Sequence, residues 1–327
     1  MTNEYMSKII DINVRSKLGE GIFIYNDPIT NLETIYWVDI FGDKIYEYCP
    51  EISKLSISDI TNLELGGYPS CIIPVNNTNI NTNINSKSNI NSKSNQKLFL
   101  LSNKHSLVLW DMTYNCIIER ISDRLPDANL RFNDGKCDSS GRLWIGTMDV
   151  DNSPKKGALY SLSTQIDKDN NSVWNLNFKI KGVSISNGLG WSSDDMYMYF
   201  IDTPERSIQV YRYNSETGNI DKPVLKTIDL SKYSGFPDGM TVDNQGYIWV
   251  AMWDGYSILR IDPNTESCVF QVTLTIPRPT NIAISTKCPG KVYVTSAMEM
   301  DVPESGYLLE IDTKLDMLSS KSNCFNC

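Results

Sequence analysis

The stretch "LRFNDGKCDSSGRLWIGTMD", residues 130–149, decides the fold class of this 327-residue chain. A polar cluster precedes a glycine, a turn of Asp, Ser and Gly follows, and an apolar strand with a large aromatic side chain comes next. Two short strands joined by such a turn are typical of antiparallel β-structure. The same arrangement recurs along the chain, so the repeats predict the architecture.

A short apolar strand, most often with Tyr or Trp, recurs six times: "TIYWVDI", "KLFLLSN", "RLWIGTM", "YMYFIDT", "YIWVAMW" and "KVYVTSA". In every unit one strand precedes it and another follows it, and no long helical periodicity competes. Units of about 42 to 55 residues that each form a small meander are typical of a propeller. We therefore predict an all-β fold, a six-bladed β-propeller with four-stranded blades around a central channel.

The domain organisation expected from this pattern is a single β-propeller over residues 1–327. The tract 76–96, "NNTNINTNINSKSNINSKSNQ", carries few core-forming residues and is predicted to be a disordered surface loop within the second blade. The segment from about 316 to 327 is expected to be a flexible tail. Its "CFNC" motif (Cys324 and Cys327) lacks a second cysteine pair or a nearby histidine, which disfavours a metal or redox site.

Composition narrows the function classes. The net charge of −9 would repel a phosphate backbone, so nucleic-acid binding is not expected, and 41% hydrophobic residues suffice for a large core. The sequence contains no apolar run that would suit a signal peptide or a membrane span. We expect a cytoplasmic protein, a monomer or weak dimer, whose eight cysteines are free thiols.

The residues that lead the first strand of each unit are polar in five of the six units. They are Glu20 in unit one, Arg131, Asn133 and Asp134 in unit three, Asn187 in unit four, Asp238 in unit five and Asn281 in unit six. First strands line the channel of a propeller, so equivalent positions converge at one mouth, where neighbouring glycines let backbones crowd together. Turn chemistry explains any single instance. Repetition at one blade position favours a site.

The oxygen donors Glu20, Asn187 and Asp238 form a set that suits a hard cation such as Ca²⁺, with water completing the coordination. No metal-binding motif of sulfur or imidazole type competes for this position.

Several motifs resemble the SMP-30/gluconolactonase/LRE-like family, which includes regucalcin (senescence marker protein 30) and gluconolactonases. They are "LGEG", "YWVDIFGDKIYEY", "RFNDGKCDSSGRLWIGTMD", "ISNGLGW" and "FPDGMTVDNQGYIWVAMWDG", in the family's order and spacing over about residues 14 to 313. The resemblance implies a six-bladed propeller with one divalent metal ion in the channel. Ca²⁺ is the favoured ion, with Zn²⁺, Mn²⁺ or Mg²⁺ as alternatives.

The family's functional residues fall on defined positions of this chain. The resemblance implies metal ligands at Glu20, Asn187 and Asp238, and substrate contacts at Arg131 and Asn133.

Two departures from the family pattern bear on the substrate. Asp151 stands where mammalian members carry Glu as an acidic substrate contact, and its side chain is one methylene shorter. Ile22 and Phe23 stand where many members have Pro and Trp, which reshapes the channel wall without removing a ligand.

Lactone hydrolysis fits such a site. A divalent metal polarises the ring ester carbonyl and activates a water molecule. Asp238 then serves as catalytic residue by accepting the proton of that water, while Arg131 and Asn133 orient substrate oxygens. The only histidine, His105, is expected to be a solvated turn residue, which disfavours Ser-His-Asp or Cys-His catalysis.

The leading interpretation is a metal-dependent, gluconolactonase-like hydrolase of sugar-type lactones. The alternative is a non-catalytic propeller, either a calcium-binding regulator or a protein-interaction platform, and a third is an esterase for another ester class. Fold alone does not separate them.

Overall fold

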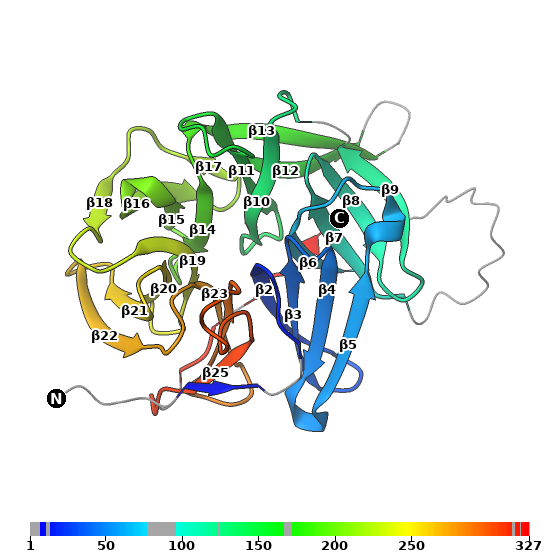
Figure 1. The fold of residues 1–327 in the computed structure, drawn as a ribbon. Helices are drawn as coiled ribbons and strands as arrows, with labels where there is room; N and C mark the ends of the chain where they lie inside the picture. Colours follow the sequence, from blue (N-terminus) through cyan, green and yellow to red (C-terminus); the bar gives the residue numbers. More distant parts are fainter. Residues whose placement is uncertain are drawn as a thin grey trace.

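The computed structural model describes residues 7–10, 14–76, 96–122, 125–166, 172–315, 318–320 and 322–326. The predicted loop 76–96 therefore lies outside the described residues, apart from its two end positions. Six small sheets stand around a common centre, which confirms the predicted six-bladed propeller (Figure 1).

Blades one to three each contain four consecutive antiparallel strands. Blade one has β2 (Gly19–Asn26), β3 (Glu33–Asp39), β4 (Lys44–Cys49) and β5 (Lys54–Asp59). Blade two has β6 (Pro69–Asn76), β7 (Leu98–Asn103), β8 (Ser106–Asp111) and β9 (Cys116–Ser122). Blade three has β10 (Leu130–Cys137), β11 (Leu143–Asp149), β12 (Gly157–Ile166) and β13 (Ser172–Val183).

The remaining blades follow the same order. Blade four has β14 (Ser186–Trp191), β15 (Tyr197–Asp202) and β16 (Ser207–Asn214), whose outer edge pairs with β17 (Asn219–Ile220) and β18 (Lys226–Asp229). Blade five has β19 (Phe236–Val242), β20 (Ile248–Trp253), β21 (Ser257–Asp262) and β22 (Ser267–Thr273). Blade six has β23 (Pro279–Ile284), β24 (Lys291–Ser296) and β25 (Leu309–Asp312).

The ring is closed by the N-terminal segment, because β1 (Ser7–Ile9) pairs antiparallel with β25 as the outermost strand of blade six. Helical structure in the described chain is limited to three short 3₁₀ turns, η1 (Pro50–Ile52), η2 (Thr61–Leu63) and η3 (Thr203–Glu205). None of the described helices is long and apolar enough to cross a membrane.

Every innermost strand carries a β-bulge near its beginning. The register with the second strand gains one extra residue in each blade, between Glu20 and Phe23, Pro69 and Cys71, Phe132 and Gly135, Ser186 and Leu189, Pro237 and Met240, and Pro279 and Ile282. A bulge re-aims the side chains of the residues that it contains. Six bulges at one level therefore turn equivalent residues toward one another across the channel.

Glycines beside the polar residues allow neighbouring inner strands to approach closely. A Cβ atom on Gly188 would lie 2.8 Å from the carbonyl oxygen of Asp238, and one on Gly239 would lie 2.2 Å from the side chain of Asn281. Any larger residue would force the strands apart, so the expected role of these glycines is confirmed.

The core consists of apolar side chains packed between adjacent blades. Trp37, Trp110, Trp144 and Trp249 are each at most 2% exposed, and each lies on a second or third strand of its blade. Seven of the cysteines lie in the described chain and all are free thiols, as predicted.

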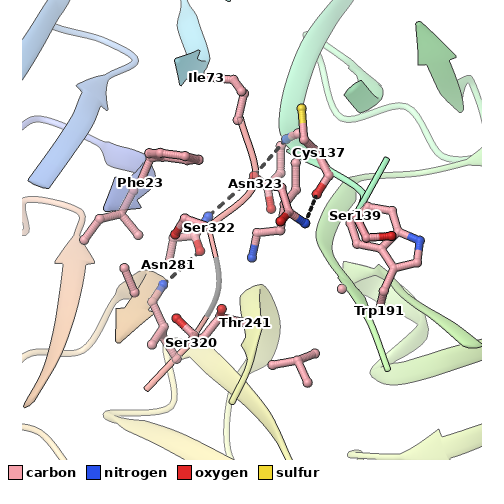
Figure 2. Close-up of a pocket in the computed structure, with 18 of the residues that line it drawn as sticks. Phe23, Ile73, Cys137, Ser139, Trp191, Thr241, Asn281, Ser320, Ser322 and Asn323 are labelled. Atoms are coloured by element: carbon pink, nitrogen blue, oxygen red, sulfur yellow. Dashed lines mark hydrogen bonds between the residues drawn. The ribbon is translucent and has the colours of Figure 1, made fainter. Parts of the chain in front are cut away.

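The described residues 318–320 and 322–326, here called the strap, differ from the expected flexible tail because they are packed against the propeller. Leu318 is fully buried against blades five and six, and Ser320 donates to the carbonyl of Ile284 at 3.3 Å. Asn323 donates to the carbonyl of Cys137 on blade three at 3.3 Å. Figure 2 shows Ser320, Ser322 and Asn323 crossing the cavity between these walls.

The far end of the strap is anchored by β26 (Phe325–Asn326), which pairs in parallel with the end of β6 in blade two. Phe325 is 1% exposed, and its ring lies 5.8 Å from that of Trp174. Apolar burial at both ends and hydrogen bonds between them explain why this polar segment is ordered. Beneath the strap lies a cavity of about 360 Å³ in the channel.

We predict that Phe325→Ala destabilises the protein by about 3 kcal/mol, because it empties a fully buried aromatic position. The same change should expose the Cys137 thiol, which is 1% exposed beneath the strap, to a maleimide reagent. Chemical denaturation and peptide-resolved mass spectrometry measure the two effects. Phe178→Ala, at a ring that is 53% exposed, is the control and should change both much less. Unchanged stability and labelling in Phe325→Ala would show that the strap is not a structural element.

Candidate active site

Five of the predicted polar residues meet at one mouth of the channel. Glu20 directly precedes the bulge of β2, whereas Asn133, Asn187, Asp238 and Asn281 lie within the bulges of β10, β14, β19 and β23. All five are between 3% and 8% exposed. Five blades thus supply one buried polar side chain each to a common space.

A chain of hydrogen bonds links the polar residues of blades three, four and five. The Nη1 atom of Arg131 donates to Asn133 Oδ1 at 2.7 Å, and Asn133 Nδ2 donates to Asn187 Oδ1 at 2.9 Å. Asn187 Nδ2 donates to Thr203 Oγ1 at 2.8 Å, and Thr203 donates in turn to the carbonyl of Pro237 at 2.9 Å. The chain fixes the orientations of both amide groups, with Asn187 Oδ1 as the acceptor toward Asn133.

Thr203 was not predicted as a site residue. It lies in η3, in the loop after β15, and no sequence motif marks it. Its contact with Pro237, the neighbour of Asp238, emerges only when blades four and five are placed side by side.

Three carboxylates gather at the centre. Burial raises the pKa of Glu20 to about 8, with the charge of Asp134 adding to the effect. The pKa of Asp238 is raised well above its usual range by burial and by the charges of Glu20 and Asp134. Burial also raises the pKa of Asp134. Carboxylates that are desolvated and close together favour a bound cation or bound protons.

Oxygen donors of this kind fit a hard divalent cation. Within the described chain, no three His, Cys, Asp or Glu side chains lie close enough to hold a metal ion by themselves. The amide oxygen of Asn187 and water would therefore complete a set begun by Glu20 and Asp238. Asp134 accepts hydrogen bonds from the Gly135 N–H at 2.9 Å and from Asn281 Nδ2 at 3.5 Å.

Arg131 lies beside the carboxylates and is 7% exposed. Burial lowers its pKa to about 10, so the guanidinium is still charged at neutral pH. Besides Asn133, it donates to the carbonyl of Phe132 at 3.0 Å, and its Cζ lies 6.0 Å from the centroid of the Tyr68 ring. A fixed planar cation at the edge of the site suits recognition of two substrate oxygens.

Asp151 and His105 lie in turns of the propeller, and Trp253 lies at the end of a strand. Asp151 is exposed in the loop after β11, where its N–H donates to Asp149 Oδ1 at 2.9 Å. Trp253 ends β20 opposite Phe236, with the Arg278 guanidinium 5.1 Å from its ring centroid. His105 lies in the turn between β7 and β8, half-buried where a solvated residue was expected.

The chain resembles known proteins over most of its length. Residues 18–298 match the model of the SMP-30/Gluconolactonase/LRE-like region. A putative sugar lactone lactonase YvrE of Bacillus subtilis is 28% identical over 305 residues, which are 92% of this chain and 91% of that protein. An uncharacterized protein of Sulfolobus acidocaldarius is 38% identical over 184 residues, which are 56% of this chain and 62% of that protein, so this match spans less than two thirds of the relative.

A solved structure of a luciferin-regenerating enzyme superposes with a TM-score of 0.77 at 26% identity, covering 98% of this chain and 99% of that one. The strap falls outside the matched region 18–298, whereas the residues of the candidate site fall inside it. Fold, motif order and the extent of the match agree, and the chain belongs to the SMP-30/gluconolactonase/LRE-like family.

Proposed function

We propose that this protein is a metal-dependent lactonase that hydrolyses sugar-type lactones. The observation that carries the proposal is the meeting of Glu20, Asn187 and Asp238 in one desolvated space, beside the fixed guanidinium of Arg131. The family and the relative named as a putative sugar lactone lactonase support a lactonase-like hydrolase. Ca²⁺ is the favoured ion because all the donors are oxygens.

In the proposed reaction, different residues of the chain have different roles. A bound divalent cation would act as a Lewis acid at the ring carbonyl and on a water molecule. Asp238 would accept the proton of the attacking water, because a bound cation would keep this buried carboxylate ionised although burial raises its pKa. Arg131 and Asn133 hold substrate oxygens, and Asp151 contacts a further hydroxyl. No covalent intermediate with the protein is needed.

A non-catalytic calcium-binding propeller is the second candidate. A regucalcin of Xenopus laevis is 29% identical over 322 residues, so the chain is similar to a regucalcin as well as to a lactonase. A small-molecule lactone partner, a cytoplasmic location and a monomeric or weakly dimeric state remain predictions.

A lactone panel separates the two candidates. Metal-stripped protein would be assayed by proton release on sugar lactones and other cyclic esters, with Ca²⁺, Zn²⁺, Mn²⁺ and Mg²⁺ added separately. Metal-stimulated turnover supports the lactonase. Binding of Ca²⁺ without turnover of any lactone would favour the regulator.

Asp238→Asn should lose far more turnover than metal occupancy. The amide keeps an oxygen that can ligate a hard cation but cannot accept a proton, and loss of a general base typically costs about a hundredfold to ten-thousandfold. Glu20→Gln is the matched control, because its lost activity should return at saturating metal. Near wild-type turnover of Asp238→Asn at saturating metal would make Asp238 a ligand only.

Arg131→Lys should lower kcat/KM about tenfold or more, which corresponds to about 1.4 kcal/mol of transition-state stabilisation. Lysine keeps the positive charge but lacks the planar guanidinium group, which can donate two parallel hydrogen bonds. Metal affinity, measured by calorimetry, should stay nearly constant because the charge near Glu20 and Asp238 is kept. A large fall in metal affinity would contradict the role of Arg131 in substrate binding.

Metal-free protein should lose stability as the pH rises from about 4.5 to about 8. The pKa of Glu20 is raised from 4.5 to about 8 in the folded state, so between these values the folded chain holds a proton that the unfolded chain releases. Each tenfold difference in proton affinity costs about 1.4 kcal/mol. Thermal unfolding in chelator would show the decline, and it should be weaker in Glu20→Gln. An equal decline in both proteins would place its origin elsewhere.

A further inference from the structure

Lys136 belongs to the innermost strand β10, and its ammonium group lies in the channel. It follows Asp134 by two residues on β10, just beyond the bulge that contains Asp134. Both line the channel cavity of about 360 Å³. The Lys136 Nζ donates to the carbonyl of Met240 on blade five at 2.6 Å, which means that the side chain reaches from blade three across to blade five.

The two cations of the site act on different carboxylates. Arg131 is the cation whose charge opposes the rise in pKa of Glu20 and of Asp238. Lys136 is the cation that does so for Asp134. Arg131 therefore counters the charges of Glu20 and Asp238, whereas Lys136 counters that of Asp134.

This arrangement bears on how strongly the site can attract a dication. The charges of Glu20, Asp134 and Asp238 act on one another, so together they attract a dication and without it they repel one another. A fixed cation in the same channel reduces both the attraction and the repulsion.

We propose that Lys136 is a built-in counterion, which neutralises Asp134 and leaves Glu20 and Asp238 as the two carboxylates available to the metal ion. Lys136 thereby weakens cation binding and stabilises the metal-free protein. The inference rests on the proposed metal site and concerns its affinity; Lys136 is a positioning residue because it acts through Asp134.

A merely structural lysine makes a different prediction. If the hydrogen bond to Met240 only braces the channel, Lys136→Met should destabilise the metal-free and metal-loaded proteins alike and should not tighten cation binding. A counterion role predicts opposite effects on affinity from the two members of the pair.

The test is calorimetric titration of chelator-treated, full-length protein with CaCl₂. Lys136→Met should bind Ca²⁺ at least tenfold more tightly, equivalent to about 1.4 kcal/mol. Asp134→Asn should bind at least tenfold more weakly, and the double variant should return to within about threefold of wild type. Lys136→Arg keeps the charge and should stay near wild type.

Lys179→Met is the matched control. Lys179 also has a pKa lowered by burial and also donates to a backbone carbonyl, that of Gly218, but it lies on the outer strand β13. Its replacement should leave Ca²⁺ affinity unchanged. Thermal unfolding gives a second readout, since Lys136→Met should lower the melting temperature in chelator and enlarge the rise caused by Ca²⁺.

The outcomes are distinguishable. Wild-type protein that binds none of Ca²⁺, Mg²⁺, Mn²⁺ and Zn²⁺ overturns the proposed metal site itself. Wild-type binding with unchanged or weaker affinity in Lys136→Met overturns the counterion role alone. If Lys136→Met does not fold, the comparison of Asp134→Asn with the double variant decides, because failure of the second substitution to restore affinity contradicts the proposal.

Discussion

The extra residue in each innermost strand is the constraint on which the site depends. A regular strand alternates its side chains between two faces, so consecutive polar residues could not both be delivered to the channel. The bulge breaks that alternation at the same level in all six blades. Asn133 and Asp134 show the result, since both are buried near the centre although they are adjacent in sequence.

Desolvation gives these residues their chemical character. In water, Glu20 and Asp238 would be ordinary carboxylates, but at the channel mouth burial raises the pKa of both. The packing that stabilises the propeller therefore also removes water from these carboxylates, so that a neighbouring positive charge stabilises their ionised forms.

Much of the fold was predictable from the sequence because each blade is a local meander whose strands and turns follow one another. Convergence of Glu20, Asn187 and Asp238 followed from the repeat alone, since equivalent positions in a ring must face one centre. Thr203 and Lys136 could not be found in this way, because their partners, Pro237 and Met240, belong to other blades. The ordered strap was not predicted either, because its composition is polar. Leu318 and Phe325 are buried only by contacts with parts of the chain that are distant in sequence.

The strap also imposes an order on how the molecule is assembled. Asn326 meets Asn76, a residue 250 positions earlier, and this contact completes a sheet whose other strands are made long before. During synthesis the opening of the channel that the strap covers therefore stays uncovered until all six blades have left the ribosome. Closing a loop of that length is slow compared with forming a hairpin. Docking of the strap is accordingly a late step of maturation, and a polypeptide interrupted before residue 318 would carry every residue of the candidate site in a channel that is still open at one end.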